Sequence, residues 1–219
     1  MMDFSSLYIL NNVIYLTEKS NTFSDVYTAV RKKEKRLFND NVVAKLPYIN
    51  NKEWKLREKS TQRFINYIAK KKETLKILDI GCGNGWFTNA IAKVSEKNHV
   101  LGLDINDAEL EQAARVFKRK NLQFVYGDIF NLENSFKQQF EIITLNSSVQ
   151  YFSNFEVLMA TLKLFLKPKG EIHIIDSPFY KKDQIASAKQ RTIKYYSSLG
   201  FPEMASNYFH HSIEAVSYT

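Results

Sequence analysis

The 219-residue sequence predicts an open α/β sandwich, in which a mostly parallel sheet lies between two layers of helices. Three observations predict it. From Leu75 onward, short apolar runs alternate with segments of helical periodicity, which favours right-handed βαβ crossovers and a sheet covered on both faces. The first apolar run ends in a glycine-rich turn, and the segment before Leu75 has a different pattern. We therefore divide the chain into an N-terminal extension, 1–74, and a ligand-binding domain, 75–219.

Five β-rich runs are the predicted parallel strands, and they span Lys76–Ile80, His99–Leu103, Leu122–Tyr126, Phe140–Leu145 and Glu171–Ile175. The helical segments between and after them span Asn84–Ser95, Asn106–Lys120, Asn154–Leu166 and Asp183–Leu199. Asn106 is a plausible N-cap with acidic residues in the following turn, and Gly200 is expected to end the last helix.

The N-terminal extension is predicted to be a hairpin followed by helices. The β-rich runs Leu7–Leu10 and Val13–Leu16 flank Asn11-Asn12, and a two-residue Asn turn is a hairpin signal. Helices are expected at Thr28–Phe38 and Asn51–Lys72. Apolar residues of the second helix form one stripe, so we expect the extension to pack on the sheet.

Composition excludes several classes of protein. The single cysteine, Cys82, allows neither an intramolecular disulfide nor a multi-thiolate zinc site, which favours a reducing, cytoplasmic setting. No apolar run approaches the ~18–20 residues of a membrane span, and Met1 is not followed by a signal-peptide pattern. The net charge is +8, with 15 basic against 8 acidic residues in 1–75 and 16 against 15 in 76–219. A nucleic-acid partner or a lysine-rich surface would each account for this charge.

The stretch from Ile77 to Gly85 carries the chemistry, because a strand there leads through a tight glycine turn into a helix N-terminus. Glycines at such a turn permit positive φ and close approach of a ligand to the backbone. The dinucleotide fingerprint G-x-G-x-x-G requires a third glycine where this chain has Trp86. The pattern is D-x-G-x-G-x-G instead, which argues against a nicotinamide oxidoreductase.

This stretch and several ordered motifs after it resemble the class I S-adenosylmethionine-dependent methyltransferases, over roughly Leu75 to Tyr180. The resemblance implies a three-layer Rossmann-like sheet that binds S-adenosyl-L-methionine and releases S-adenosyl-L-homocysteine. It implies that Asp79 helps to hold the ammonium end of the cofactor and that the turn wraps its methionine portion. The implied turn residues are Gly81, Cys82, Gly83 and Gly85.

The resemblance also assigns the rest of the cofactor site. Asp104 at the end of the second strand, with Ile105 beside it, would receive the ribose hydroxyls; the alternative is a surface acid at a strand end. Asp128 would accept from the adenine amine while the Ile129 backbone N–H faces the ring, although Asp128 is also a candidate helix cap. Asn146 follows the fourth strand, where the family contacts the methionine end.

No catalytic residue is assigned, because a sulfonium methyl group is already activated and alignment of the acceptor supplies much of the catalysis. Gln150, Tyr151 and His210 are candidates for the acceptor pocket; packing is the alternative for Tyr151, and a solvated pair with His211 for His210. The sequence after the fourth strand lacks the box of amino-directed nucleic-acid methyltransferases, and Cys82 is a poor cytosine nucleophile. No cluster of acids and histidines predicts a metal.

Two features bear on the acceptor. In many small-molecule methyltransferases an N-terminal helical segment covers the cofactor, where Trp54 and Arg57 are candidates; core packing is the alternative for Trp54. The C-terminus departs from the family, because Asn207–His210 is the sole candidate strand after Gly200, so we expect the C-terminal strands to be incomplete.

The sequence thus predicts a cytoplasmic methyltransferase, outside the membrane, that acts on a small-molecule acceptor. Two alternatives stay open. RNA methylation is suggested by the basic runs Arg31–Arg36 and Lys70–Lys72, and a non-catalytic cofactor-binding or interaction module by the short C-terminus.

Overall fold

The structure is a computed structural model that describes residues 8–19 and 22–216. Its centre is a seven-stranded sheet in the order β1-β2-β5-β4-β3-β6-β7. The strands are β1 (Tyr8–Leu10), β2 (Val13–Tyr15), β3 (Lys76–Ile80), β4 (His99–Asp104), β5 (Leu122–Tyr126), β6 (Phe140–Asn146) and β7 (Leu166–Ile175). β1 is antiparallel to β2, and the other pairings between these described strands are parallel. The predicted, mostly parallel sheet is confirmed.

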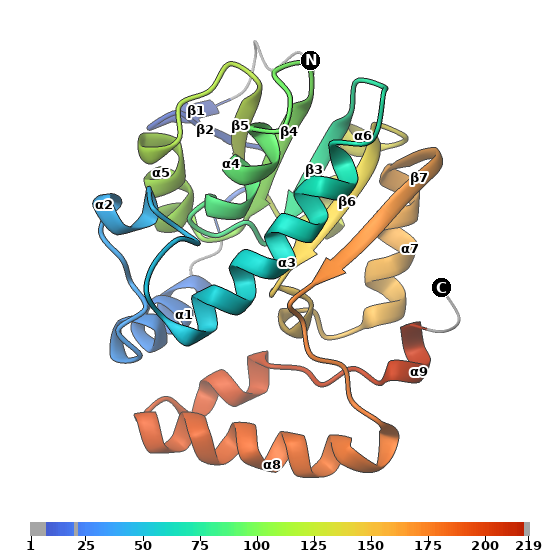
Figure 1. The fold of residues 1–219 in the computed structure, drawn as a ribbon. Helices are drawn as coiled ribbons and strands as arrows, with labels where there is room; N and C mark the ends of the chain where they lie inside the picture. The colour runs from blue at the N-terminus through green and yellow to red at the C-terminus, as the bar shows by residue number, and fades with distance from the viewer. Residues whose placement is uncertain (1–7, 20–21, 217–219) are drawn as a thin grey trace.

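Helices cover both faces of the sheet, which gives the predicted three layers (Figure 1). One face carries α3 (Lys52–Ile68), α4 (Trp86–Ala92) and α5 (Asp107–Val116), and the other carries α6 (Glu133–Phe136) and α7 (Phe155–Phe165). Successive side chains of a strand point to opposite faces. Ile77 of β3 therefore belongs to the core under α3–α5, and its neighbour Leu78 to the core under α6 and α7.

The N-terminal hairpin forms as predicted. Asn11 and Asn12 connect β1 to β2 with φ of 51° and 64°, the left-handed values that a two-residue hairpin turn requires. β2 then pairs in parallel with β5, so the hairpin lengthens the sheet at that edge. Leu7, the first residue of the predicted run, lies outside the described residues.

Asparagine side chains fix the starts of several helices. Asn51, Asn106 and Asn154 precede α3, α5 and α7, and each side-chain oxygen accepts a backbone N–H of the first turn. Such a cap satisfies a donor that the helix cannot pair itself. The predicted end of the long C-terminal helix is also confirmed, because Gly200 follows α8 (Lys182–Leu199) in the left-handed conformation.

A further layer lies below the carboxyl ends of the strands (Figure 1). It joins α1 (Thr22–Lys33) from the N-terminal segment to α8 and η3 (Pro202–Asn207) from the C-terminal one, with a small core of Val30, Tyr196 and Met204. Within the described ranges, no helix is long and apolar enough to cross a membrane.

The remaining short elements are α2 (Asp40–Val43), η1 (Ile129–Asn131), η2 (Val149–Tyr151) and α9 (Ile213–Val216).

Some predicted boundaries are wrong. α1 spans Thr22–Lys33, so it begins and ends several residues earlier than the predicted helix Thr28–Phe38. α5 ends at Val116 because Phe117 leaves the helical conformation and turns its ring into the core, where it is 8% exposed.

Two predictions about the C-terminal half also need correction. In the segment predicted as the strand Asn207–His210, Asn207 ends η3 and the following residues are irregular, where the Phe209 N–H donates to the carbonyl of Gln150 in η2 at 2.7 Å. β7 begins at Leu166, earlier than the predicted strand start at Glu171, and its first part contains an irregularity with Lys169 at φ 67°. Beyond β7, the described residues form helices and irregular segments apart from the isolated bridge between Tyr180 and Ser212.

Candidate functional site

A cavity of about 360 Å³ lies at the carboxyl ends of β3, β4, β5 and β6. We call it the main cavity. In open parallel sheets this edge is where ligands bind, since the loops that follow adjacent strands diverge there. Its volume is in the range of small-molecule sites. Four of the loops that follow strands contribute to its lining, through Gly81 and Gly83, Asp104–Asn106, Gly127–Phe130, and Ser147 with Ser148.

The glycine turn after β3 forms the floor of this cavity. Gly81 and Gly83 both line it and have φ of 67° and 52°, in the left-handed region. A Cβ at Gly81 would lie 2.4 Å from the Cβ of Ser148, and one at Gly83 would lie 3.1 Å from a carboxylate oxygen of Glu109. The turn therefore requires glycine for its backbone conformation and for the space above it.

The predicted turn residues differ in what they face. Gly85 does not line the cavity; it precedes α4, and a Cβ there would lie 2.6 Å from the Phe124 ring. Cys82 is buried at 8% exposure, and burial raises the pKa of its thiol well above the usual value.

Asp104 joins the glycine turn to the loop after β4. One carboxylate oxygen accepts the Gly83 N–H at 2.7 Å, and the other accepts the N–H groups of Ile105 and Asn106 at 2.7 and 2.9 Å. Burial raises the pKa of Asp104, and these donors oppose the rise because they stabilise the ionised form. The carboxylate is thus held rigidly at the cavity wall, where the oxygen that accepts from Gly83 keeps one acceptor position for a ligand hydroxyl.

Asp128 acts as a cap and also lines the cavity, so both roles considered from the sequence are compatible. Its carboxylate accepts the Phe130 N–H at 3.1 Å and the Asn131 amide at 2.9 Å. Ile129 and Phe130 line the same end of the cavity. The Asp128 N–H donates to the Thr17 hydroxyl at 3.2 Å, which brings in the segment that follows β2.

Asp79 lies inside the sheet, 1% exposed, and lines neither of the cavities described here. Its oxygens accept the hydroxyls of Thr88 at 2.6 Å and Thr144 at 2.8 Å. Burial raises its pKa to about 7 despite these two bonds. In this arrangement Asp79 ties β3 to α4 and β6 beneath the glycine turn.

A second cavity of about 130 Å³ adjoins the first at Gly81, Gly83, Glu109 and Ser147. We call it the arginine cavity, because Arg31, Arg36 and Arg57 of the N-terminal segment line it. Asn146 faces it from the end of β6, and both of its side-chain amide atoms are buried without a hydrogen-bond partner.

Glu109 stands where the two cavities meet, on the first turn of α5. Burial raises its pKa to about 7, the Asp104 carboxylate adds to the rise, and Arg31 opposes it.

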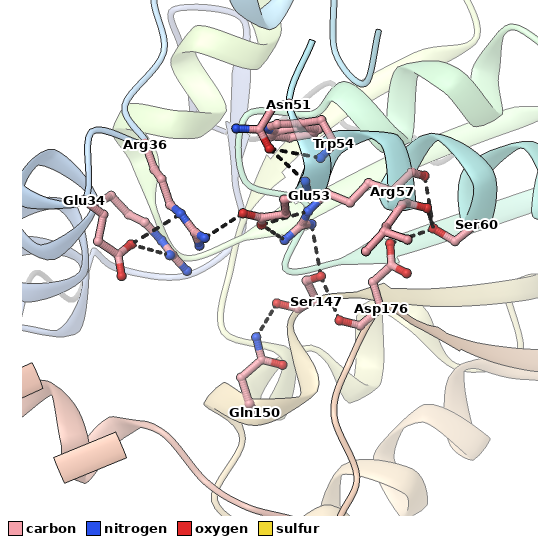
Figure 2. Close-up of polar contacts among 12 residues, drawn as sticks. Glu34, Arg36, Asn51, Glu53, Trp54, Arg57, Ser60, Ser147, Gln150 and Asp176 are labelled. Atoms are coloured by element: carbon pink, nitrogen blue, oxygen red, sulfur yellow. Dashed lines mark hydrogen bonds and ion pairs between the residues drawn. The ribbon is translucent and has the colours of Figure 1, made fainter. Parts of the chain in front are cut away.

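A chain of polar contacts connects the N-terminal segment to the ends of the strands (Figure 2). Arg36 donates to Glu53 at 2.7 Å, Glu53 also accepts from Arg57 at 3.1 Å, and Arg57 donates to the Ser147 hydroxyl at 3.1 Å. Farther along α3, the Ser60 hydroxyl donates to Asp176 at 2.7 Å. Ser147 and Asp176 follow β6 and β7 with φ of 54° and 52°, so α3 holds two strained strand ends.

Of the predicted acceptor residues, only Tyr151 lines the main cavity. Its ring lies 5.6 Å from that of Tyr27 and 5.7 Å from that of Phe23, and its hydroxyl accepts from Arg31 at 2.7 Å. Gln150 is buried and donates to the Ser147 carbonyl at 2.6 Å.

The histidine pair lies outside both cavities. His210 bonds the Thr192 hydroxyl at 2.9 Å, and His211 is 9% exposed with its ring 3.2 Å from the Val149 carbonyl. Both histidines are therefore engaged within the molecule, and the alternative of a solvated pair does not hold.

Sequence reasoning missed the residues that α1 and α5 contribute: Phe23, Tyr27 and Glu109. The sequence predicts Glu109 only as one of the acidic residues in the first turn of a helix. Because it follows Asp104 by five residues, however, it lies about one helical turn beyond the end of the strand. For α1, the apolar spacing of Phe23, Val26, Tyr27 and Val30 is the signal that indicated a helix starting earlier.

The site fits S-adenosylmethionine in three respects. The glycine turn borders the cavity with backbone that carries no side chain, Asp104 offers a fixed carboxylate that can accept a hydroxyl, and Asn146 presents an unpaired buried amide. These match a nucleoside ribose at one end and an amino acid group at the other.

Comparison with known proteins agrees with this fit. Residues 71–214 match the family model described as methyltransferase domain. The malonyl-[acyl-carrier protein] O-methyltransferase of Halalkalibacterium halodurans is 29% identical over 123 residues, which cover 52% of this chain and 45% of that protein. The sterol 24-C-methyltransferase of Kluyveromyces lactis is 28% identical over 151 residues, 66% of this chain and 40% of that protein. The chain spans less than half the length of these two relatives.

Solved structures share the fold. The phosphoethanolamine N-methyltransferase 2 of Haemonchus contortus, solved with S-adenosyl-L-methionine, superposes with a TM-score of 0.63 at 18% identity and covers 90% of this chain and 43% of that one. At that identity the likeness concerns the fold.

Proposed function

Because the chain belongs to the methyltransferase domain family, a family of S-adenosylmethionine-dependent enzymes, we propose that it transfers the cofactor's methyl group to a small-molecule acceptor. The observation that carries the proposal is the glycine turn joined to Asp104 at the open edge of the sheet. A tight βα turn that served packing alone would not need a carboxylate fixed beside Gly83 by the Gly83 N–H.

We propose the following division of the cofactor site. Asp104, with Ile105, receives the ribose hydroxyls; Asp128 and Ile129 flank the adenine; and the glycine turn with Asn146 receives the methionine portion. Cys82 is a small side chain within the turn, and Gly85 allows α4 to pack on Phe124. Asp79 acts through Thr88 and Thr144, by keeping the turn in position beneath the ammonium end.

Bound S-adenosylmethionine supplies a methyl group activated by its sulfonium sulfur, and in-line displacement by the acceptor leaves S-adenosylhomocysteine. The chain's own contribution is to align the acceptor and to exclude water. Tyr151, Tyr27 and Phe23 are the residues we assign to the acceptor side of the main cavity. Gln150 supports this side through Ser147, and His210 through Thr192 of α8.

We further propose that the N-terminal extension, 1–74, is a lid on the cofactor domain, 75–219. α1 contributes Tyr27 and Arg31, and α3 contributes Trp54 and Arg57, to the walls of the two cavities. Trp54 also packs against Trp86 with ring centroids 5.3 Å apart, so one side chain serves both core and cavity.

A small-molecule acceptor is favoured over RNA by the relatives, one of which is a sterol 24-C-methyltransferase, and by the pairing of part of the basic runs. Arg31 and Arg36 of the first run donate to Glu34 and Glu53, and Lys71 of the second donates to Glu171. Residues paired in this way within the molecule present less free charge to phosphates.

Titration calorimetry with S-adenosylhomocysteine and with NADH tests the cofactor, and we expect only the first to bind. Transfer of a labelled methyl group is then measured with a metabolite extract and with total RNA as acceptors. Label in the small-molecule fraction supports the proposal. Label confined to RNA contradicts the acceptor class, and binding of NADH alone contradicts the cofactor.

A further inference from the structure

The hairpin at one edge of the sheet exposes apolar side chains on both of its faces. β1 forms this edge, and among the described strands it pairs with β2 alone (Figure 1). Successive side chains of a strand point to opposite faces, so a strand with one covered face alternates between buried and exposed residues. In β1, however, Tyr8, Ile9 and Leu10 are all exposed, by 61%, 56% and 36%, whereas the three residues of β2 are buried. These three residues form an apolar surface that no other described part of the chain covers.

A groove of about 600 Å³ lies between this hairpin and the end of α5. We call it the hairpin groove. Ile9, Asn12 and Ile14 of the hairpin contribute to its lining, together with Ala114 and Phe117 at the end of α5. None of its lining residues lines the main cavity or the arginine cavity, so the groove is separate from the proposed cofactor site.

The charged residues of the hairpin groove are all basic. Lys118, Arg119 and Lys120 line it and are exposed, and the described lining contains no acidic residue. Arg119 donates to the Asn89 amide oxygen at 2.8 Å, but none of the three cations forms an ion pair with another described residue. Unlike the arginines of the N-terminal segment, these cations keep their charge available for an anionic partner.

The combination of exposed aliphatic residues and unpaired cations favours one class of anionic partner. Ile9 and Leu10 can neither stack on bases nor bond to them, which disfavours RNA. A second copy of this chain would bring two sets of the groove's cations together, which is unfavourable. The surface of one folded protein would cover one face of β1, whereas the fluid interface of a bilayer can surround side chains on both faces. Lipid headgroups also accept a tyrosine at this depth.

We propose that the hairpin and the hairpin groove dock the protein on an anionic membrane surface, where Tyr8, Ile9 and Leu10 enter the headgroup region and Lys118 and Lys120 contact anionic headgroups. The docking is peripheral, since no helix in the described ranges is long and apolar enough to cross a membrane. It goes beyond the proposed function and does not rest on it, because it uses no residue of the two cavities assigned to the reaction.

Co-sedimentation of the full chain with vesicles tests the docking. One set of vesicles contains phosphatidylcholine alone, and the other an equal mixture of phosphatidylcholine and phosphatidylglycerol. We expect the wild type to bind the mixed vesicles more tightly, and to lose most of this binding when salt is raised from about 0.1 M to about 1 M, because the Debye length then falls from ~10 Å to ~3 Å. Equal binding to both sets, or binding to neither, overturns the proposal.

The cations of the groove are tested by the double variant Lys118→Gln with Lys120→Gln. Each cation near an anionic surface contributes roughly fivefold in affinity, so we expect binding to the mixed vesicles to fall by about 20- to 30-fold. Lys55→Gln with Lys59→Gln is the matched control, because it removes two exposed lysines of α3 that line none of the three cavities. An equal loss in the control means that net charge alone attracts the protein, which overturns the proposal.

The apolar surface is tested by Ile9→Thr, which keeps a β-branched residue in the strand. We expect it to weaken binding to the mixed vesicles by about threefold to tenfold, because less apolar area leaves water. Leu56→Gln, at a position of α3 that is 63% exposed, should bind as the wild type does. Thermal melting establishes that each variant is folded, and the lysine double variant tests the docking independently if Ile9→Thr melts early. Unchanged binding in both Ile9→Thr and the lysine double variant overturns the proposal.

Two further results would identify a different occupant and also overturn the proposal. One is a dimer in sedimentation velocity that Ile9→Thr dissociates, without vesicle binding, which makes this surface an interface between copies of the chain. The other is binding of poly-L-glutamate but not of vesicles, lost in Lys118→Gln with Lys120→Gln, which indicates an acidic protein as the partner.

Discussion

The cofactor domain and the N-terminal segment contribute opposite charges to two adjoining cavities. Asp104 and Asp128 at the ends of strands and Glu109 of α5 line the main cavity, whereas Arg31, Arg36 and Arg57 of the N-terminal segment line the arginine cavity, where Glu109 meets them. The excess of positive charge in residues 1–75 thus has a local use, because part of it is placed against acids of the sheet domain and against Glu34 and Glu53. The net charge of a segment therefore indicates less about its role than the side chains with which its charged residues pair.

The largest expected effect concerns the glycine turn after β3. Gly83→Val places a branched side chain at φ 52° in the cavity floor, with its Cβ 3.1 Å from the Glu109 carboxylate. We expect S-adenosylhomocysteine binding to be abolished in calorimetry, because the side chain fills the space above the turn. Gly200→Ala is the control for backbone strain alone, since Gly200 has φ 88° and a Cβ there would meet no atom within 4 Å beyond its chain neighbours. Unchanged affinity in Gly83→Val would exclude this turn as the binding site.

Asp104 tests whether the sheet's carboxylate binds ligand as well as backbone. Asp104→Ala should weaken S-adenosylhomocysteine by roughly 1.5–3 kcal/mol, the scale of hydrogen bonds to a charged group. Asp107→Ala removes a nearby acid at the start of α5, which pairs with Lys19, and we expect it to leave the affinity unchanged. Equal effects of the two variants in calorimetry would mean that general charge, and not the fixed carboxylate, matters.

The buried acids predict a pH dependence of stability. Burial raises the folded-state pKa of Asp79 to about 7 from an ordinary value of 3.8, so between these pH values the folded state binds more protons than the unfolded state. Stability from this group therefore falls as pH rises from about 4 to about 7, by an amount on the order of a few kcal/mol. Asp79→Asn should flatten the dependence in urea unfolding at pH 5, 6, 7 and 8.

Glu109 provides the comparison for Asp79. Its pKa is also raised to about 7, so Glu109→Gln should flatten the pH dependence in the same direction, over the window from about 4.5 to 7. Glu109 lines both cavities and Asp79 lines neither. Only Glu109→Gln should therefore also change how the affinity for S-adenosylhomocysteine depends on pH. An undiminished slope in both variants would show that these carboxyls titrate normally.

Local features of the structure could be predicted from the sequence, whereas long-range ones could not. The strands and the glycine turn were predictable because β periodicity and a run of glycines are local signals, and Asn11-Asn12 marked its hairpin in the same way. The arginine cavity was not, because Arg57 meets Ser147 across 90 positions of sequence. The inward orientation of Asp79 was missed since its partners, Thr88 and Thr144, belong to other elements. Residue placements that depend on long-range packing leave little trace in one sequence.

The smallest expected effect concerns the N-terminal segment, at the cap of α3. Asn51 caps α3 by accepting the N–H groups of Glu53 and Trp54, and Asn51→Ala should lower the free energy of unfolding by about 1 kcal/mol. Because the first turn of α3 carries Glu53, which positions Arg57, we also expect affinity for S-adenosylhomocysteine to fall by about twofold to threefold as that turn frays. Asn154→Ala removes the equivalent cap of α7, on the other face of the sheet, and should cost similar stability at unchanged affinity. Urea unfolding and calorimetry on both variants separate the two effects. If both variants lose affinity equally, the N-terminal segment has no special part in binding, and the site belongs to the sheet alone.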